Sequence, residues 1–157
     1  MLRLGDTISS VLKHKGKEIW SVKPEQTVYE AIESMAEKGV GALLVVSSGK
    51  LVGIISERDY ARKVILKGRS SKETPVKEVM TSPVFFVTPK HTLDECMALM
   101  TNHRIRHLPV MEEENVVGVV SIGDLVKWII AEQEEIIAEQ AETIEYLVAF
   151  RHQPGKG

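Results

Sequence analysis

The sequence has a single cysteine, Cys96, among 157 residues. One cysteine excludes an intramolecular disulfide framework and the usual cysteine-rich zinc sites. Acidic residues at 94 and 95 and apolar residues at 97 and 98 flank it, a pattern typical of a helix with one buried face. We therefore expect a protein of a reducing compartment, and we predict the cytoplasm.

Long hydrophobic runs and an excess of one charge are also missing. The longest apolar stretches, such as 42–46 and 116–120, fall far short of the ~20 residues that span a bilayer. Residues 1–10 carry an acid and a glycine where a signal peptide needs an apolar stretch. The 20 basic and 22 acidic residues give a net charge of −2, whereas nucleic-acid-binding domains carry a basic excess. We expect neither a membrane nor a nucleic acid as partner.

What the sequence does contain is an ordinary globular composition, 43% hydrophobic and 27% charged. The length suits one compact domain or two very small ones. A large catalytic domain beside a regulatory one does not fit, because each would need about 100 residues or more. If the protein is a regulator, the enzyme that it regulates lies on another chain.

The chain contains one sequence twice, offset by 65 positions without a gap. Residues 22–27 align with 87–92, and residues 52–59 align with 117–124. The residues of the first copy that recur identically in the second are Val22, Pro24, Thr27, Glu30, Met35, Leu43, Val45, Val52, Gly53, Ser56 and Asp59. Such self-similarity predicts two equivalent structural units.

Each copy is predicted to fold as β-α-β-β-α, with a second helix directly after its last strand. The first helix is expected to start after Thr27 or Thr92, each three residues before a glutamate, and to end near Gly39 in the first copy. The expected strands are 19–22, 43–46 and 51–55, and then 84–87, 108–111 and 116–120. Each unit is too small to hide both faces of its sheet alone. We therefore predict an α+β fold in which two pseudo-symmetric units pack sheet to sheet.

Three segments lie outside the two copies. Residues 6–15 are predicted to form a helix capped by Asp6, with Ile8, Val11 and Leu12 facing inward. The linker holds one helical turn, and a long helix closes the chain. The expected boundaries are 1–18 for the N-terminal helix and lead-in, 19–67 and 83–131 for the two repeats, 68–82 for the linker, 132–150 for the C-terminal helix extension and 151–157 for a disordered tail.

The expected C-terminal helix, 124–150, is unusually long for so small a domain. Ile130, Ile137 and Ile144 are seven residues apart, so one face stays apolar beyond the end of the repeat. A domain of this size cannot cover that face. We therefore expect a homodimer that this helix strengthens.

The sequence motifs resemble those of tandem cystathionine-β-synthase (CBS) domains, which form a Bateman module. The resemblance rests on GIISERD at 53–59, GVVSIGD at 118–124 and RIRHLPV at 104–110, and it spans about residues 1 to 132. Residues 56–72 with 79–81 are similar to stand-alone two-repeat proteins of bacteria and plant organelles. The resemblance implies a regulatory, non-catalytic protein that binds an adenosine compound (AMP, ADP, ATP, NAD or S-adenosylmethionine) between its repeats and pairs into a four-repeat disk.

Ser56 with Asp59, and Ser121 with Asp124, also have the spacing of a plain helix capping box. The recurrence of the pair after the same strand, in a family that binds ribose there, favours a binding role. A carboxylate accepts hydrogen bonds from both ribose hydroxyls, and a helix N-terminus attracts phosphate. We assign the aspartates to ribose and the serines to phosphate or a neighbouring hydroxyl.

Basic residues and a small-residue slot complete the expected sites. Most of the basic residues between 57 and 72 are expected on a solvated helix face, whereas Arg69 follows Gly68 in a turn with Ser70, where donors can converge on phosphate. Arg106 and His107 should point to opposite faces of a strand, and either could contact the ligand or form a surface ion pair. The candidate nucleotide-binding residues are Val40, Gly41, Ala42, Ser56, Arg58, Asp59, Arg69, Ser70, Arg106, His107, Ser121 and Asp124.

The slot at 40–42 admits adenine because small residues let the backbone approach the base. The equivalent 105–107 is bulkier and charged, so the two sites should differ in affinity or ligand. Trp20 could stack on a base, but we expect it in the core.

No dinucleotide fingerprint, Walker loop, metal-binding face or nucleophile–base pair is apparent. We therefore predict an adenine-nucleotide sensor with no catalytic cofactor. The alternative is an interaction scaffold with vestigial clefts.

Overall fold

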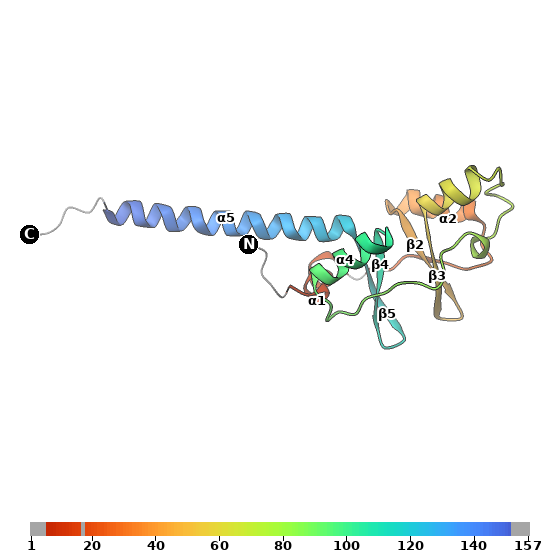
Figure 1. Ribbon diagram of the computed structural model, residues 1–157, viewed down its shortest axis with the longest axis horizontal. Helices are drawn as coiled ribbons and strands as arrows, with labels where there is room; N and C mark the ends of the chain where they lie inside the picture. The colour runs from red at the N-terminus through yellow and green to blue at the C-terminus, as the bar shows by residue number, and fades with distance from the viewer. Residues whose placement is uncertain (1–5, 17, 152–157) are drawn as a thin grey trace, which may run out of the picture.

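The computed structural model describes residues 6–16 and 18–151, and it has the predicted α+β fold with a long C-terminal helix (Figure 1). Helix α1 (Ile8–Lys15) precedes the first repeat, which consists of β1 (Ser21–Val22), α2 (Val28–Lys38), β2 (Ala42–Ser47), β3 (Lys50–Ser56), α3 (Glu57–Tyr60) and the π-helical turn η1 (Ala61–Ile65). A 3₁₀ turn, η2 (Val76–Glu78), lies in the linker. The second repeat consists of α4 (Leu93–His103), β4 (His107–Glu112), β5 (Asn115–Ser121) and α5 (Ile122–Arg151). The expected tail from 152 on lies outside the described residues.

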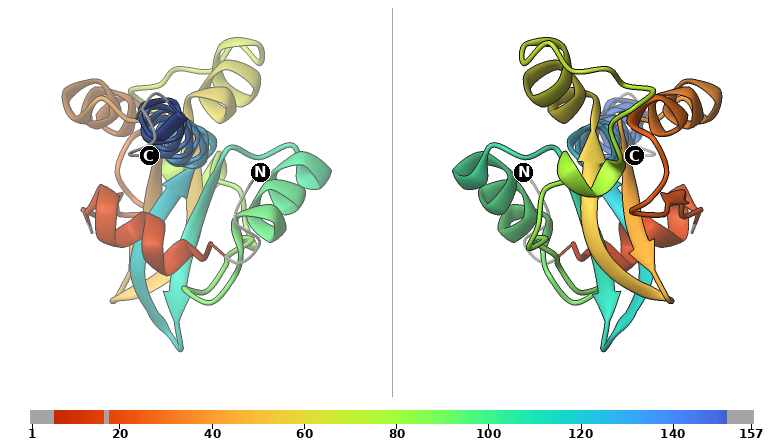
Figure 2. Two further views of the ribbon diagram at one scale, coloured as in Figure 1. Left: turned by 90° about the vertical axis from the view of Figure 1, so that its left-hand side faces the viewer. Right: turned by 90° about the vertical axis from the view of Figure 1, so that its right-hand side faces the viewer.

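The two predicted hairpins are confirmed and form the centre of the molecule. β2 pairs antiparallel with β3, and β4 pairs antiparallel with β5. The two hairpins lie side by side with the helices around them (Figure 2). Val45 and Leu43 of β2, and Leu108 and Val110 of β4, are buried because alternate strand residues point into the core of their own repeat.

The strand predicted at 84–87 is wrong, and a proline explains the difference. In the first repeat β1 runs parallel to β2, and Leu44 N–H donates a hydrogen bond to the Trp20 carbonyl. The residue of β4 equivalent to Leu44 is Pro109, which has no N–H to donate. Val87 therefore forms only an isolated bridge with Val110.

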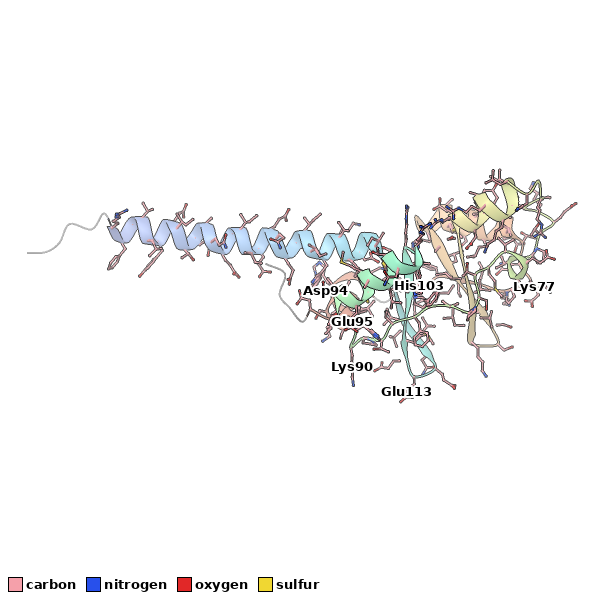
Figure 3. The ribbon with its side chains drawn as sticks, viewed as in Figure 1. Lys77, Lys90, Asp94, Glu95, His103 and Glu113 are labelled. Carbon is pink, nitrogen blue, oxygen red and sulfur yellow. The ribbon has the colours of Figure 1, made fainter. Side chains whose placement is uncertain are left out.

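Both repeat helices start where the capping pattern predicts. Thr27 and Thr92 accept hydrogen bonds from the backbone N–H groups of Glu30 and Glu95. Only Glu95 (Figure 3) returns the bond, because its carboxylate accepts from Thr92 N–H at 3.2 Å. That bond is the main reason why the pKa of Glu95 lies below its ordinary value.

The segments that precede the repeats are exchanged between them. Ile8, Val11 and Leu12 of α1 pack in the core of the second repeat, whereas Val76 and Val79 of the linker pack in the core of the first. The backbone bonds match: Leu93 N–H donates to the Asp6 carbonyl, and Val28 N–H donates to the Thr74 carbonyl. Helix α1 is thus the counterpart of the linker segment and not an element outside the repeat.

The predicted cap of α1 is wrong. The N-cap residue is Thr7, whose side chain makes no capping hydrogen bond. The Asp6 carboxylate instead accepts a hydrogen bond of 3.2 Å from Trp128 Nε1 of α5. The Asp6 carboxylate, which the sequence pattern predicts to cap the backbone N–H groups of α1, therefore binds the distant Trp128 indole instead.

Helix α5 begins as part of the second repeat and then leaves the body of the molecule (Figure 1). Its buried residue is Leu125, with Trp128 and Ile129 packed at the edge of the core. The side chains along its outer part stand away from all other elements (Figure 3). Among the described residues, no helix is both long and apolar enough to cross a bilayer.

Candidate ligand cleft between the repeats

A pocket of about 330 Å³ lies between the start of β2 and the N-terminal end of α5, and we call it cleft 1. This volume lies at the lower end of the range for small-molecule sites. Six of the predicted site residues line it together: Val40, Gly41, Ala42, His107, Ser121 and Asp124. The first three come from one repeat and the other three from the other, so cleft 1 joins the repeats.

The acidic side of cleft 1 is a capping pair at the start of α5. Asp124 N–H donates to Ser121 Oγ at 3.1 Å, and Ser121 N–H donates to Asp124 Oδ2 at 2.8 Å. The sequence pattern for a capping box is therefore realised as such. The capping bond uses only Oδ2 of the carboxylate, since Asp124 Oδ1 accepts no hydrogen bond from the described residues.

A lysine that is not among the predicted site residues also reaches this carboxylate. Lys15 Nζ lies 2.6 Å from Asp124 Oδ2, and it donates a second bond of 2.6 Å to the Val119 carbonyl. Burial opposes ionisation of Asp124, but the bonds from Lys15 and Ser121 outweigh it and lower the pKa of the carboxyl. Asp124 is therefore ionised at neutral pH.

His107, the strand partner of Ser121, also lines cleft 1. Its ring lies so close to Gly41 that a side chain at position 41 would place its Cβ 3.5 Å from His107 Cε1. Burial lowers the pKa of His107, and the nearby Asp124 carboxylate only partly offsets this effect. The ring is neutral at pH 7 and can donate or accept one hydrogen bond at each nitrogen.

Trp20 is 37% exposed and lines cleft 1, so its expected place in the core is wrong. Lys38 Nζ lies 4.4 Å from the centre of the Trp20 ring in a cation–π contact. The indole is held in place by this contact on one side of a cleft that is large enough for a small ligand.

The equivalent position around Ser56, Arg58, Asp59, Arg104 and Arg106 is called site 2. Both oxygens of Asp59 are engaged there. Oδ2 accepts from Ser56 N–H and Oγ at 3.0 Å each. Oδ1 lies 2.9 Å from Lys63 Nζ and accepts from Thr81 Oγ1 at 3.3 Å. A ligand hydroxyl would have to replace one of these partners.

Three glycines that line cleft 1 have arginine counterparts at site 2. Gly39, Gly41 and Gly123 correspond to Arg104, Arg106 and Arg58 under the offset of 65. Arg106, which precedes β4, is exposed, whereas His107 is half-buried. Site 2 is therefore more crowded and more basic than cleft 1.

Two predicted ligands of phosphate lie elsewhere. Arg69 Nη2 lies 2.6 Å from Glu78 Oε2, and both side chains are well exposed. The Ser70 carbonyl accepts a hydrogen bond from Thr74 Oγ1. Neither residue is among those that line cleft 1, and their roles in binding phosphate stay predictions.

Cys96 is fully buried in the second repeat, as expected. Burial raises the pKa of its thiol to about 12. The thiol is therefore protonated at neutral pH and serves as a small core residue.

Two β-hairpin units with exchanged leading segments and a cleft across their contact define a tandem-repeat module. The chain belongs to the CBS domain family, whose model matches residues 10–65 and 76–131. The first match starts inside α1, whereas the sequence pattern predicts that the repeat starts at residue 19.

The chain is similar to several named relatives. It is 46% identical over 139 residues to the mitochondrial CBS domain-containing protein CBSX3 of Arabidopsis thaliana, with 82% of this chain and 67% of that protein covered. It is 38% identical to the CBS domain-containing protein YhcV of Bacillus subtilis, with 75% and 84% covered.

Solved structures agree. A CBS-domain protein from Burkholderia ambifaria is 54% identical and superposes with a TM-score of 0.78, with 81% of this chain and 96% of that chain covered. The CBS domain pair of protein MJ0100, solved with 5′-methylthioadenosine and S-adenosyl-L-methionine, is 22% identical with a TM-score of 0.72, and it covers 82% of this chain and 98% of its own. The second likeness is one of fold.

Proposed function

We propose that the protein is a regulatory module that binds an adenine nucleotide (AMP, ADP, ATP or NAD) in cleft 1 and acts on a separate partner protein. The observation that carries the proposal is the geometry of cleft 1. The small-residue slot 40–42 and the Ser121–Asp124 pair line the same pocket. The adenosine compounds bound by MJ0100, a protein of the same fold, are consistent with it.

Each part of a nucleotide has a matching group in cleft 1. Asp124 Oδ1, for which the described residues provide no hydrogen-bond donor, accepts a ribose hydroxyl, and a charged acceptor of this kind is worth about 1.5–3 kcal/mol per bond. The backbone at Gly41 and Ala42 takes the edge of the base, with the Trp20 ring on the same wall. The N-terminal end of α5 and the lysines at the rim favour phosphate.

Site 2 takes the same ligand more weakly. Ser56 and Asp59 repeat the ribose-binding pair, but Asp59 already has partners at both oxygens. Arg58 and Arg106 supply positive charge for phosphate there. The proposed order of affinity is cleft 1 before site 2.

A ligand in cleft 1 touches both repeats and therefore fixes their relative position. It shifts the equilibrium between two arrangements only by the difference in its affinity for them. The exposed outer half of α5 carries the response, either to a second copy of the chain or to the regulated enzyme. We propose a non-catalytic, homodimeric protein of the cytoplasm, although CBSX3 is a mitochondrial protein by name.

Thermal unfolding of the purified chain with AMP, ADP, ATP, NAD and S-adenosylmethionine tests the proposal. A ligand present at about 100 times its dissociation constant adds about 2.7 kcal/mol to the free energy of unfolding. Guanosine monophosphate at the same concentration is the control for ionic effects. If no adenosine compound raises the melting temperature more than this control, the scaffold alternative is favoured.

A further inference from the structure

Lys15 lies beside the Asp124 carboxylate of cleft 1, which is proposed to bind the ribose. Its ammonium group lies between the carboxylate of Asp124 and the carbonyl of Val119, 2.6 Å from each acceptor. The Asp124 side chain is only 17% exposed, so the ion pair is partly shielded from water. A ribose that binds this carboxylate must share it with Lys15 or displace the lysine.

The position of Lys15 follows from the packing of α1 on the second repeat. Leu12 lies against Gly118 of β5, where a Cβ would come within 2.7 Å of Leu12 Cδ2. The missing side chain at 118 lets α1 approach the strand closely. Lys15, at the C-terminal end of the same helix, is thereby placed beside Val119, the next residue of the strand.

At site 2 the aspartate is also paired with a lysine, but this lysine comes from a different place in the fold. Asp59 pairs with Lys63, which stands four residues later in the same helical segment. The residue equivalent to Lys63 in the second repeat is Trp128. The lysine of cleft 1 therefore comes from a separate element, whose position can change without breaking a turn of α5.

The charged side chains that line cleft 1 leave a positive excess. Lys15, Lys38 and Lys127 line it, against the two acids Glu18 and Asp124. His107 adds no charge at neutral pH, because burial lowers its pKa. An anionic group is the complement of this lining.

We propose that Lys15 is a specificity-determining residue, which makes cleft 1 selective for adenosine ligands that carry a phosphate on the ribose. The inference rests on the proposed function. Without ligand, Lys15 pairs with Asp124. With a nucleotide bound, the flexible side chain of Lys15 pairs with the phosphate, while the ribose of the same nucleotide binds the Asp124 carboxylate. Adenosine offers no anionic partner for the ammonium group, and S-adenosylmethionine has a positively charged sulfonium next to its ribose, where AMP carries its phosphate.

Calorimetric titration of the full chain with AMP, adenosine and S-adenosylmethionine tests this role in three variants. Lys15→Met keeps the length of the side chain and removes the charge. Lys15→Arg keeps the charge. Lys13→Met is the matched control, because Lys13 is an exposed lysine of the same helix that does not line cleft 1.

We expect wild type, Lys15→Arg and Lys13→Met to prefer AMP over adenosine by about tenfold or more. Lys15→Met should lose roughly tenfold to a hundredfold in AMP affinity while its affinity for adenosine stays equal or rises, because Asp124 is then free. An unchanged ratio of AMP to adenosine affinity in Lys15→Met overturns the role of Lys15 and leaves the proposed function standing. Absence of binding of all three ligands to wild type overturns both.

Discussion

Arg58 Nη1 donates a hydrogen bond of 2.7 Å to the carbonyl oxygen of Arg104, and this bond ties the two repeats together at site 2. In cleft 1 the equivalent positions are Gly123 and Gly39, which cannot form such a bond. Arg104 also adopts a left-handed backbone with φ of 53°, as Gly39 does with φ of 66°. One repeat contact is thus closed by an arginine and the other is left open.

The open state of cleft 1 should depend on Gly123. A Cβ at this position would meet only Ser121 Oγ, at 3.6 Å, so Gly123→Ala fits without strain. Gly123→Arg introduces the residue of site 2, which we expect to reach Gly39 and fill the cleft. Calorimetry should show AMP binding to Gly123→Ala as in wild type and a loss of about tenfold or more for Gly123→Arg. Equal affinities in both variants would contradict the proposed location of the nucleotide.

Asp124→Ala and Asp59→Ala should each remove one adenosine site while the protein stays folded. A cap of this kind contributes only ~1 kcal/mol to stability, whereas the ribose loses its charged acceptor. The stoichiometry in a titration should fall in each variant, and Asp124→Ala should remove the tighter site. Unchanged affinity and stoichiometry in both variants would show that the pairs Ser56–Asp59 and Ser121–Asp124 serve only as caps.

Gly118→Ala should destabilise the protein by about 1–3 kcal/mol, because the added methyl group overpacks the contact with Leu12. Gly123→Ala is the matched control, since it adds the same methyl group where the nearest atom, Ser121 Oγ, is 3.6 Å away. Urea unfolding of the two variants measures the difference. A stability of Gly118→Ala equal to that of Gly123→Ala would mean that α1 does not seat closely on β5.

The stability of the fold should fall as the pH falls below neutral, because of His107. The unfolded chain takes up a proton near the ordinary pKa of 6.5, whereas burial lowers the pKa of His107 in the folded protein. Below pH 6.5 the unfolded state therefore binds more protons, and the free energy of unfolding decreases by at most about 1.4 kcal/mol per pH unit for this group. Urea midpoints measured from pH 7.5 to 5 should fall more steeply for wild type than for His107→Gln. Parallel curves would exclude this contribution.

The parts of the fold that follow from local pattern could be predicted from the sequence. The apolar runs at 43–46 and 116–120 predict strands of the two hairpins, and the Ser121–Asp124 spacing predicts the cap that lines cleft 1. These features depend on residues within a few positions of one another, so spacing alone determines them.

The parts that depend on contacts between distant residues could not be predicted. Lys15 and Asp124 are 109 positions apart, and no local pattern pairs them. Leu93 bonds to Asp6 and Val28 bonds to Thr74, so Asp6 and Thr74 are equivalent residues. They lie 68 positions apart, whereas the repeats are offset by 65, and the exchange of α1 with the linker therefore does not follow from the sequence repeat. The common spacing of apolar residues at 8, 11 and 12 and at 76, 79 and 80 was the available signal.

The outer half of α5 should strengthen self-association of the protein. Its apolar side chains are largely exposed, with Ile137 at 63%, Ile144 at 61% and Phe150 at 67%. Each side chain of this size gains roughly 1.5–3 kcal/mol when it is fully buried, so a second chain that covers them gains substantially. A chain truncated after Ala131 keeps Leu125 and Trp128 and should stay folded, but it should sediment as a weaker dimer than the full chain.

A full-length variant distinguishes the effect of the apolar face on dimerisation from the effect of shortening the helix. Ile137→Gln with Ile144→Gln removes two apolar contacts and should weaken the dimer, whereas Glu139→Gln with Glu142→Gln changes two exposed acids of the same helix and should not weaken it. Sedimentation equilibrium gives the dissociation constant of each form. If the truncated chain and the isoleucine variant dimerise as tightly as the full chain, the apolar face of α5 serves the regulated partner and the dimer forms through the repeats.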